Sequence, residues 1–293
     1  MISIVIPSFN RRDSVLQLLH DVYAQDETDI EVLVVDDGSA DDSVEAIRKK
    51  FPAVRLFVNE VNGGPAVTRN RGIREAKGDI IVGFDSDVTV PDPSLLTKVK
   101  AGFKRNPAAT GFAFRILGPD GVSDDVPRWW HPLPVAQFAD KAFETSYFSG
   151  TAYAFRRDAV IEAGLFSEIV YMHYEEAVLA FRIIDNGGSI FHAPELTVRH
   201  HVMPTPRRNR IRIFYKPRAQ VLFAYLCFPV ARGTAYLVPR LAYGLLCALR
   251  DRYLTSFLSA IRSAGTLIRQ SGERNPLRTE TWKRIAGMRQ QAS

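Results

Sequence analysis

Residues 82–88 read Val-Gly-Phe-Asp-Ser-Asp-Val, an apolar segment that ends in two carboxylates one residue apart. In an extended chain, side chains two positions apart point the same way, so Asp85 and Asp87 are expected to face one hard cation at the end of a strand. A cation held there could bind a diphosphate. By itself, an Asp-x-Asp segment is more often a polar turn after a strand, so the choice depends on the sequence upstream.

Apolar segments alternate with segments of helical spacing over the first 90 residues. The expected strands cover residues 2–7, 31–35, 54–58 and 80–84. Helices are expected between them, including one over residues 65–76. This alternation predicts an α/β fold with a mostly parallel central sheet and right-handed crossovers. Because parallel strands present their carboxyl ends at one rim, functional residues are expected there.

Polar residues follow three of these strands, at residues 7–10, 36–39 and 85–87. A carboxylate at Asp36 or Asp37 can accept hydrogen bonds from a base or a ribose. An ordinary turn with a helix cap would use the same residue types.

The segment over residues 62–72 reads Asn-Gly-Gly-Pro-Ala-Val-Thr-Arg-Asn-Arg-Gly. Its glycines permit close approach of the backbone to a ligand, Pro65 suits the first position of a helix, and Arg69 falls one turn inside that helix. The segment therefore suits a nucleotide diphosphate. The sequence has no Gly-x-Gly-x-x-Gly after the first strand and no Gly-Lys-Ser/Thr loop, which disfavours dinucleotide oxidoreductases and P-loop nucleotidases.

The composition is that of a globular protein with an uneven distribution of charge. Hydrophobic residues make up 46% of the 293 residues, and the two cysteines form no metal-ligand spacing or disulfide framework. With no signal-like start, a cytoplasmic location is expected. Residues 201–293 hold 17 Lys and Arg against 3 Asp and Glu, so the net charge of +6 comes from this part of the chain.

Four ordered segments carry a resemblance to a known family: Ile-Val-Ile-Pro-Ser-Phe-Asn, Val-Val-Asp-Asp-Gly-Ser, the segment over residues 62–72, and Phe-Asp-Ser-Asp. They resemble the family 2 glycosyltransferases of the GT-A fold, with the rhamnosyltransferase-like members of bacterial polysaccharide biosynthesis among them. The resemblance implies a Rossmann-like catalytic domain over residues 1–205.

The resemblance also implies a nucleotide-diphosphate sugar as donor, with UDP, dTDP or GDP as the nucleotide. The donor is expected to contact Pro7, Ser8, Asn10, Asp36, Asp37, Asn62, Gly63, Arg69, Asp85 and Ser86. A divalent cation, Mn²⁺ or Mg²⁺, is expected at Asp87, with Asp85 beside it.

The second half of the chain resembles the acceptor side of the same family. Phe-Ser-Gly-Thr-Ala at residues 148–152 includes Gly150, where a small residue permits close approach of a sugar. Glu175 and Glu176 are similar to the Glu-Asp pair whose second acid is the base, which implies that Glu176 takes this role. The second acid here is Glu rather than Asp, and Val178 stands where many relatives place a further acid, so the choice between the two glutamates stays open.

The expected chemistry is a single displacement. A cation stabilises the departing diphosphate, and a carboxylate on the opposite face takes the proton of the acceptor hydroxyl. One carboxylate base without a glycosyl-enzyme intermediate predicts inversion at the anomeric carbon.

Two further groups of residues are candidates for the site. Residues 189–193 and 196–202 are expected to form two short strands, and His200 is favoured over His201 as a metal ligand because alternation turns one of them inward. Trp129 and Trp130 offer aromatic faces to an acceptor sugar, and packing in the core is the alternative.

Residues 206–293 are expected to form a basic helical extension. Arginines interrupt its apolar stretch, so no segment reaches the length of a membrane-spanning helix. Helices lying on an anionic membrane surface at the inner face are expected, with Leu237, Leu241, Leu245 and Leu246 on the buried side. The alternative is a subdomain packed on the catalytic core or in a homodimer. The polar residues after Gln270 are expected to be loosely ordered.

The acceptor stays open among a saccharide, a lipid-linked and a small-molecule compound, and nucleic acid is not an expected partner. Two other functions compete with glycosyl transfer. A nucleotidyltransferase would usually show an N-terminal glycine-rich phosphate loop, which this sequence lacks. The second competing function is that of a catalytically silent relative, which would bind a nucleotide sugar without transferring it. Val178 is the only residue that supports this alternative.

Overall fold

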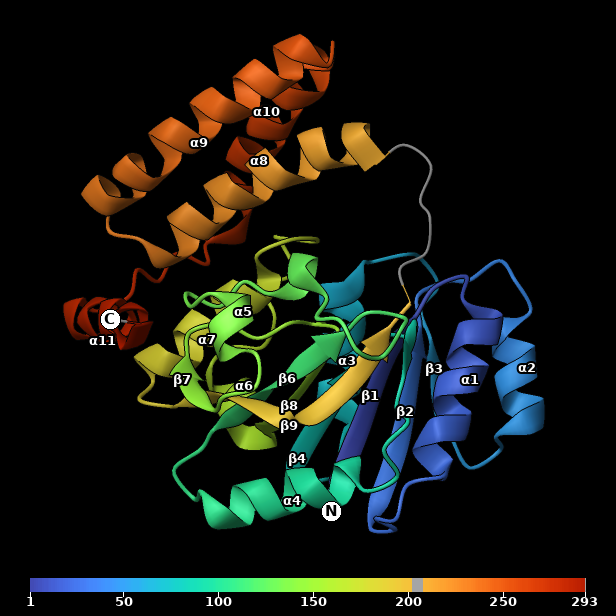
Figure 1. The fold of residues 1–293 in the computed structure, drawn as a ribbon. Helices are drawn as coiled ribbons and strands as arrows, with labels where there is room; N and C mark the ends of the chain where they lie inside the picture. The colour runs from blue at the N-terminus through green and yellow to red at the C-terminus, as the bar shows by residue number, and fades with distance from the viewer. Residues whose placement is uncertain (202–207, 293) are drawn as a thin grey trace.

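The computed structural model describes residues 1–201 and 208–292, and side chains at residues 1–201 and 212–290 (Figure 1). Its main part is a central sheet covered by helices on both faces, and a group of helices lies above one end of it. This is the expected α/β architecture.

The described part of the chain forms a sheet in the order β3-β2-β1-β4-β8-β6-β9-β5, with β7 paired to β9. The strands are β1 (Ile2–Ser8), β2 (Ile30–Asp36), β3 (Arg55–Val58), β4 (Ile80–Phe84), β5 (Val88–Thr89), β6 (Gly111–Leu117), β7 (Phe143–Thr145), β8 (Ala152–Arg156) and β9 (Ile190–His200). The four strands expected in the first 90 residues are confirmed, within two residues at each end.

The expectation of a mostly parallel sheet holds only for its first half. Strands β1 to β4 pair in parallel, as the helical crossovers between them require. Strand β8 then pairs antiparallel with both β4 and β6, so the sheet as a whole is mixed. The two strands expected over 189–193 and 196–202 are one strand, β9, whose register against β6 shifts after Phe114.

Helices bury apolar stripes on both faces of the sheet. One face is covered by α1 (Arg12–Tyr23), α2 (Ser43–Lys50) and α4 (Leu95–Arg105), which share a hydrophobic cluster with the strands. The other face is covered by α3 (Pro65–Glu75), α6 (Arg157–Glu162) and α7 (Glu175–Asp185). Two short helices, η1 (Val126–Arg128) and α5 (Val135–Phe138), lie in the connection before β7. The parallel pairing of β1, β2 and β4 brings their carboxyl ends together at one rim of this three-layer unit.

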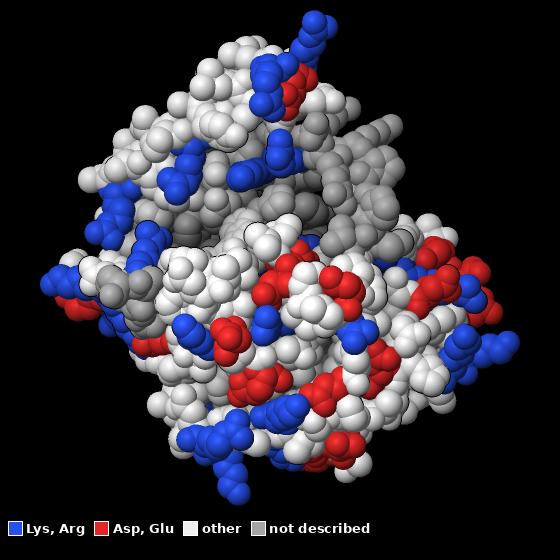
Figure 2. Space-filling model, in the orientation of Figure 1, with Lys and Arg blue, Asp and Glu red and all other residues white. Residues whose placement is uncertain are grey.

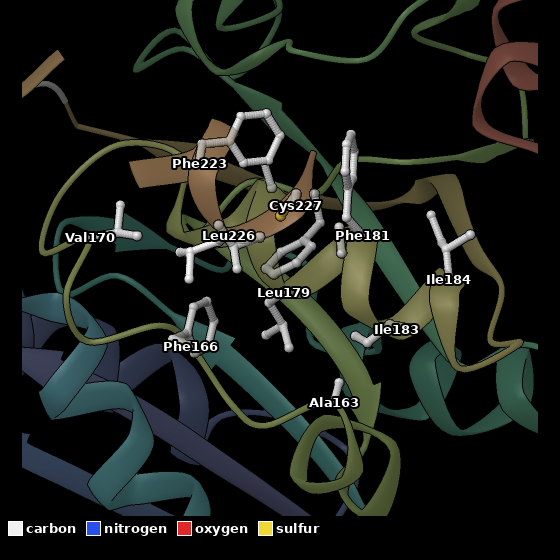
Figure 3. Packing of buried hydrophobic residues seen from close by; sticks show 14 of the residues in the cluster. Ala163, Phe166, Val170, Leu179, Phe181, Ile183, Ile184, Phe223, Leu226 and Cys227 are labelled. Carbon is white, nitrogen blue, oxygen red and sulfur yellow. The ribbon is translucent and has the colours of Figure 1, made fainter. Parts of the chain in front are cut away.

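The C-terminal extension contains α8 (Arg208–Cys227), α9 (Val230–Arg250), α10 (Leu254–Ser271), α11 (Thr279–Met288) and η2 (Arg289–Ala292). The second half of α8 packs against the α/β unit, where Phe223, Leu226 and Cys227 share a hydrophobic cluster with Phe181 of α7 (Figure 3). The expected domain boundary at residue 205 lies outside the described residues, as does Arg207 of the basic stretch. The extension thus shares its hydrophobic cluster with the α/β unit.

The expectation of loose order after Gln270 is wrong. Helix α11 buries Trp282, Ile285 and Met288 in the same cluster, and the Trp282 ring lies 4.5 Å from that of Phe228. Only these three apolar residues at helical spacing anchor the helix. Polar residues surround them in the sequence, so the apolar periodicity is too weak to predict a packed helix.

Helices α9 and α10 leave many apolar side chains exposed. Leu237 and Leu241 are partly buried against the core clusters, so the expectation that they share one open side with Leu245 and Leu246 is wrong. The open side carries Val238, Leu245, Leu246 and Leu249 instead. No helix in the described part of the chain has the length and apolarity needed to cross a membrane.

Candidate active site

Three of the predicted segments meet at the rim. Strand β1 ends at Ser8, which pairs with Asp36 at the end of β2, and the backbone N–H of Asp37 donates to the Ser8 carbonyl at 2.8 Å. Strand β4 ends at Phe84, and the N–H of Asp85 donates to the Thr151 carbonyl at 3.0 Å. The order of parallel strands therefore brings together residues up to 77 positions apart in sequence.

The two aspartates after β2 have different roles in the fold. Asp36 is fully buried, and its carboxylate accepts hydrogen bonds from the backbone N–H and the hydroxyl of Ser39, at 2.8 and 2.6 Å. Asp37 accepts from the N–H groups of Gly63 and Gly64, at 3.0 and 2.8 Å. Asp36 thus closes a turn, whereas Asp37 ties the glycine loop to the rim.

Two asparagines and a tyrosine border the same loops. Asn10 lies at a positive φ of 51°, and its side-chain carbonyl accepts from the N–H of Ala40 at 2.8 Å. The hydroxyl of Tyr171 donates to Asn62 Oδ1 at 3.3 Å, and its ring covers Gly64, where an added Cβ would lie 2.4 Å away. Gly64 has a φ of +87°, so its position requires glycine twice over.

The chain turns after β4, and this corrects the expected geometry of the two aspartates. Residues 85–87 are not extended, so Asp85 and Asp87 do not project from one strand in the same direction. Asp85 accepts from the guanidinium of Arg69 at 2.7 Å. Asp87 faces His200, with 3.6 Å between Asp87 Oδ1 and His200 Nε2. The turn thus assigns each carboxylate a different partner.

His200 is the inward histidine of the pair. It is 2% exposed and its Nδ1 lies 2.6 Å from Asp125 Oδ2, whereas His201 lies against Thr89, with its Nε2 3.0 Å from the hydroxyl. A hydrogen bond from Nδ1–H to Asp125 would leave the lone pair of Nε2 directed toward Asp87, an arrangement typical of metal-binding histidines. Burial and the nearby Asp85 raise the pKa of Asp87, with His200 opposing the shift.

These residues fit a divalent cation that is shared with a substrate. The carboxylate of Asp87 and the imidazole of His200 are both suitable ligands, and Mg²⁺ or Mn²⁺ commonly combines one or two protein ligands with phosphate oxygens. The described residues contain no cluster of three or more His, Cys, Asp or Glu that could hold a metal alone. A site built this way would be completed by the diphosphate.

The glutamate pair at the start of α7 lies on the other side of Arg69. Arg69 Nη1 is 3.7 Å from Glu175 Oε1, and both side chains are 5% exposed. Glu176 is less buried, and its Oε1 accepts from the backbone N–H of Gly150 at 3.2 Å. Burial and the charge of Glu176 raise the pKa of Glu175 well above its usual range, while Arg69 opposes the shift. Glu176 is therefore the more accessible carboxylate.

Val178 does not weaken this arrangement. It is fully buried in the hydrophobic cluster behind the pair. Residues two apart on a helix are separated by about 200°, so position 178 faces away from Glu176. An acid there would lie in the core of this chain rather than in the site.

Buried polar atoms without a hydrogen-bond partner gather around this rim. Among the described residues they include Ser8 Oγ, Arg69 Nη1, Thr151 Oγ1, Tyr153 OH and Glu175 Oε2. Buried polar groups are nearly always paired in folded proteins, so unpaired ones call for an explanation such as a bound water, ion or ligand or a catalytic role. Those at the rim offer hydrogen-bonding atoms to a polar ligand.

The two tryptophans lie in different surroundings. Trp129 packs among His131, Phe143 and His192, and its Nε1 donates to the Leu133 carbonyl at 2.6 Å, so the structure does not bring it to the site. Trp130 is 42% exposed and lies 5.4 Å from the ring of Tyr174, the residue before the glutamate pair.

Comparison with known proteins decides the family. The sequence model described as "Glycosyl transferase family 2" matches residues 3–164, more than half of the chain. The chain belongs to glycosyl transferase family 2. The matched residues include β1 to β4 and all the donor-side candidates, as well as Gly150.

Curated members of family 2 match shorter segments. An uncharacterized glycosyltransferase of Haemophilus influenzae is 37% identical over 98 residues, which are 32% of this chain and 39% of that protein. The putative teichuronic acid biosynthesis glycosyltransferase TuaG of Bacillus subtilis is 27% identical over 128 residues, 43% of this chain and 51% of TuaG. The matches thus span about half or less of these relatives.

Solved structures share the fold of this family 2 chain at low identity. TarS 1–349 of S. aureus in complex with UDP-GlcNAc has a TM-score of 0.65 at 17% identity, covering 91% of this chain and 81% of that one. The mannosyltransferase PcManGT of Pyrobaculum calidifontis, in complex with GDP-Man and Mn²⁺, has a TM-score of 0.60 at 20% identity, covering 99% and 85%. Both likenesses show the GT-A fold.

Two residues at this family 2 site have no signal in the sequence. Asp125 lies 75 positions before His200, in a loop without a motif. Arg128 directly precedes the two tryptophans in sequence; its guanidinium lies 3.5 Å from His200 Nε2 and close enough to Asp87 to oppose the rise of that carboxyl's pKa. Only the fold of the loop before β7 places them here.

Proposed function

We propose that this chain is an inverting, metal-dependent glycosyltransferase that moves a sugar from a nucleotide diphosphate to an acceptor hydroxyl. One observation carries the proposal: Arg69 joins Asp85 on the donor side to the glutamate pair, and the Gly150 segment connects both. A leaving-group site and a base carboxylate are thus neighbours in one polar rim.

The donor side would hold the nucleotide diphosphate. Asp37 and the glycine loop that it holds, with Ser8, Asn10 and Asn62, border the space assigned to the nucleotide. Arg69 would neutralise charge on the diphosphate; its Nη1, 3.7 Å from Glu175 Oε1, makes no hydrogen bond. Donors in the structural neighbours are GDP-Man and UDP-GlcNAc, which supports a UDP, GDP or dTDP sugar here.

Asp87 and His200 would hold a divalent cation, and Asp125 would orient the imidazole. When bound, such a cation supplies positive charge to the departing diphosphate. The Mn²⁺ in the PcManGT complex supports a divalent metal in this fold. Arg128 is placed to add a second positive charge on the same side.

Glu176 would act as the base. Its carboxylate takes the proton of the acceptor hydroxyl while the oxygen attacks the anomeric carbon, and the bond from that carbon to the diphosphate breaks. Glu175 is held against Arg69 and is too buried to reach an acceptor. Because one carboxylate acts from the face opposite the leaving group, the configuration inverts. Trp130 would offer its exposed ring to the acceptor.

The helical extension would rest on an anionic membrane surface. Its open apolar side chains Val238, Leu245, Leu246 and Leu249 lie on one face of α9, and Leu254 and Leu258 of α10 are exposed as well. Figure 2 shows mainly Lys and Arg among the charged side chains of this extension, whereas both signs of charge are mixed on the α/β unit. Apolar residues flanked by basic ones favour binding to the interface of anionic lipids.

Calorimetry with UDP, GDP and dTDP, each with and without Mn²⁺, tests the donor side. One nucleotide is expected to bind in a Mn²⁺-dependent manner, and hydrolysis of the matching sugar donors would then separate an active transferase from a silent relative. Failure of all three nucleotides to bind would refute the proposal.

A further inference from the structure

A groove between α8 and α9 opens beside the glutamate pair. Its volume is about 440 Å³, within the range of small-ligand sites. Tyr174, which directly precedes Glu175, forms part of its wall, and Gln220 of α8 donates to the Tyr174 hydroxyl at 3.4 Å. The groove therefore adjoins the proposed acceptor side without belonging to the donor rim.

The polar part of the groove is positively charged. Arg212, Lys216 and Arg240 line it, and no acidic residue does so among those the structure describes. In the described part of the chain none of the three forms an ion pair with a carboxylate; Asp251, near Arg212, pairs with Arg250 at 2.7 Å. Arg240 donates one N–H to the Tyr236 carbonyl at 3.0 Å, and its guanidinium lies 3.9 Å from the centre of the Tyr236 ring. Three cations that line one groove without an acidic residue in its described lining favour an anionic ligand.

The rest of the lining is apolar. Ile213, Pro217 and Pro239 face the groove, and Tyr243, which is 69% exposed, stands at its rim. Tyr243 belongs to α9, the helix that also carries the exposed Leu245, Leu246 and Leu249. A ligand that fills it must combine a negative head with an apolar chain.

A second observation connects the groove with the loop that precedes the glutamate pair. Burial lowers the pKa of the His173 imidazole, and the nearby charges of Lys216 and Arg128 lower it further. His173 and Tyr174 both have positive φ values, 66° and 67°, in the tight loop that sets the start of α7. An anion bound at Lys216 would thus lie beside the loop that positions Glu176.

We propose that this groove binds the phosphate and the first part of the hydrocarbon chain of an amphiphilic, phosphate-bearing acceptor, whose hydroxyl then reaches Glu176. The inference rests on the proposed function of the neighbouring site. It selects a lipid-linked phosphate among the acceptor classes that the sequence left open.

Binding of dodecyl phosphate to the full chain tests the inference, measured by calorimetry below the micelle concentration and without donor. Inorganic phosphate and dodecyl maltoside serve as the separate head and chain probes. Dodecyl phosphate is expected to bind at least about tenfold more tightly than either, because both the charge and the methylene groups contribute. Equal affinity for inorganic phosphate, or for the maltoside, would overturn the inference.

Charge reversal locates the binding. Lys216→Glu is expected to weaken dodecyl phosphate binding by at least about tenfold, since it removes one charge-assisted hydrogen bond and adds repulsion. Arg262→Glu is the matched control: Arg262 is an exposed arginine of α10 outside the groove and should leave the affinity unchanged. Equal effects of the two variants would overturn the inference. If the unaltered chain binds a nucleotide but not dodecyl phosphate, the groove proposal alone is refuted. If it binds dodecyl phosphate but no nucleotide, the donor-side proposal alone is refuted.

Discussion

Replacing Gly150 with Ala should disable the site while the fold stays intact. An added Cβ would lie 2.6 Å from both Arg69 Nη2 and Glu176 Oε1, about 0.8 Å inside the 3.4 Å at which ordinary contact begins. Arg69 is held by Asp85, so Glu176 has the greater freedom to move away. A displacement near 1 Å of a catalytic group can cost about 100-fold in rate, and we expect kcat to fall by roughly that factor.

Steady-state transfer from the sugar donor identified by calorimetry measures this effect, with hydrolysis of the same donor in the absence of acceptor as a second readout. If Gly150 serves the geometry of Glu176, both rates fall. If it only allows close approach of the acceptor, KM for the acceptor rises and donor hydrolysis is unchanged. Gly265→Ala is the control, because nothing lies within 4 Å of its added Cβ and alanine favours the helix. A Gly150→Ala enzyme within about threefold of the original kcat would refute the reasoning, since a misplaced base cannot be that mild.

Three further predictions concern the base, the metal and the membrane. Glu176→Gln should keep nucleotide binding and lower turnover by about 10²–10⁴-fold, the usual effect of losing a general base, and a larger loss of turnover in Glu175→Gln would show that the other acid acts. Asp125→Asn should weaken Mn²⁺-dependent nucleotide binding by about 10- to 100-fold, because the His200 imidazole loses the carboxylate that orients it; calorimetry at several Mn²⁺ concentrations measures this, and unchanged metal affinity would exclude the role. The full chain should co-sediment with phosphatidylglycerol vesicles, and high salt should reduce the bound fraction. Leu246→Glu should also reduce the bound fraction, because Leu246 is 64% exposed on the proposed membrane-binding face. A bound fraction that changes neither with salt nor with this substitution would contradict the proposed surface.

Much of the donor side could be predicted from the sequence, because its signals are local. Alternating strands and helices imply a parallel arrangement in which the carboxyl ends of the strands share a rim. This predicts that Ser8, Asp36 and Asp85 lie at the same rim. Because side chains alternate along a strand, the sequence also predicted that only one of His200 and His201 faces inward. Strand positions in the first 90 residues followed from periodicity, whereas their order in the sheet came from the structure.

What only the tertiary structure decided depends on contacts between distant segments. The turn at residues 85–87 separates the two carboxylates, and only then does Asp85 meet Arg69 while Asp87 meets His200. Asp125 reaches His200 through a loop that has no periodic pattern.

The C-terminal extension shows the same limit. Its charge and apolar content were evident in the sequence, but the same composition suits a lipid surface and a packed subdomain. The structure divides it: Leu226 of α8 and Trp282 of α11 are buried in the catalytic core, while Leu246 of α9 stays open. Local sequence determines whether a helix has an apolar face, and the partner of that face is set by the rest of the fold, because burial is a property of the assembled chain.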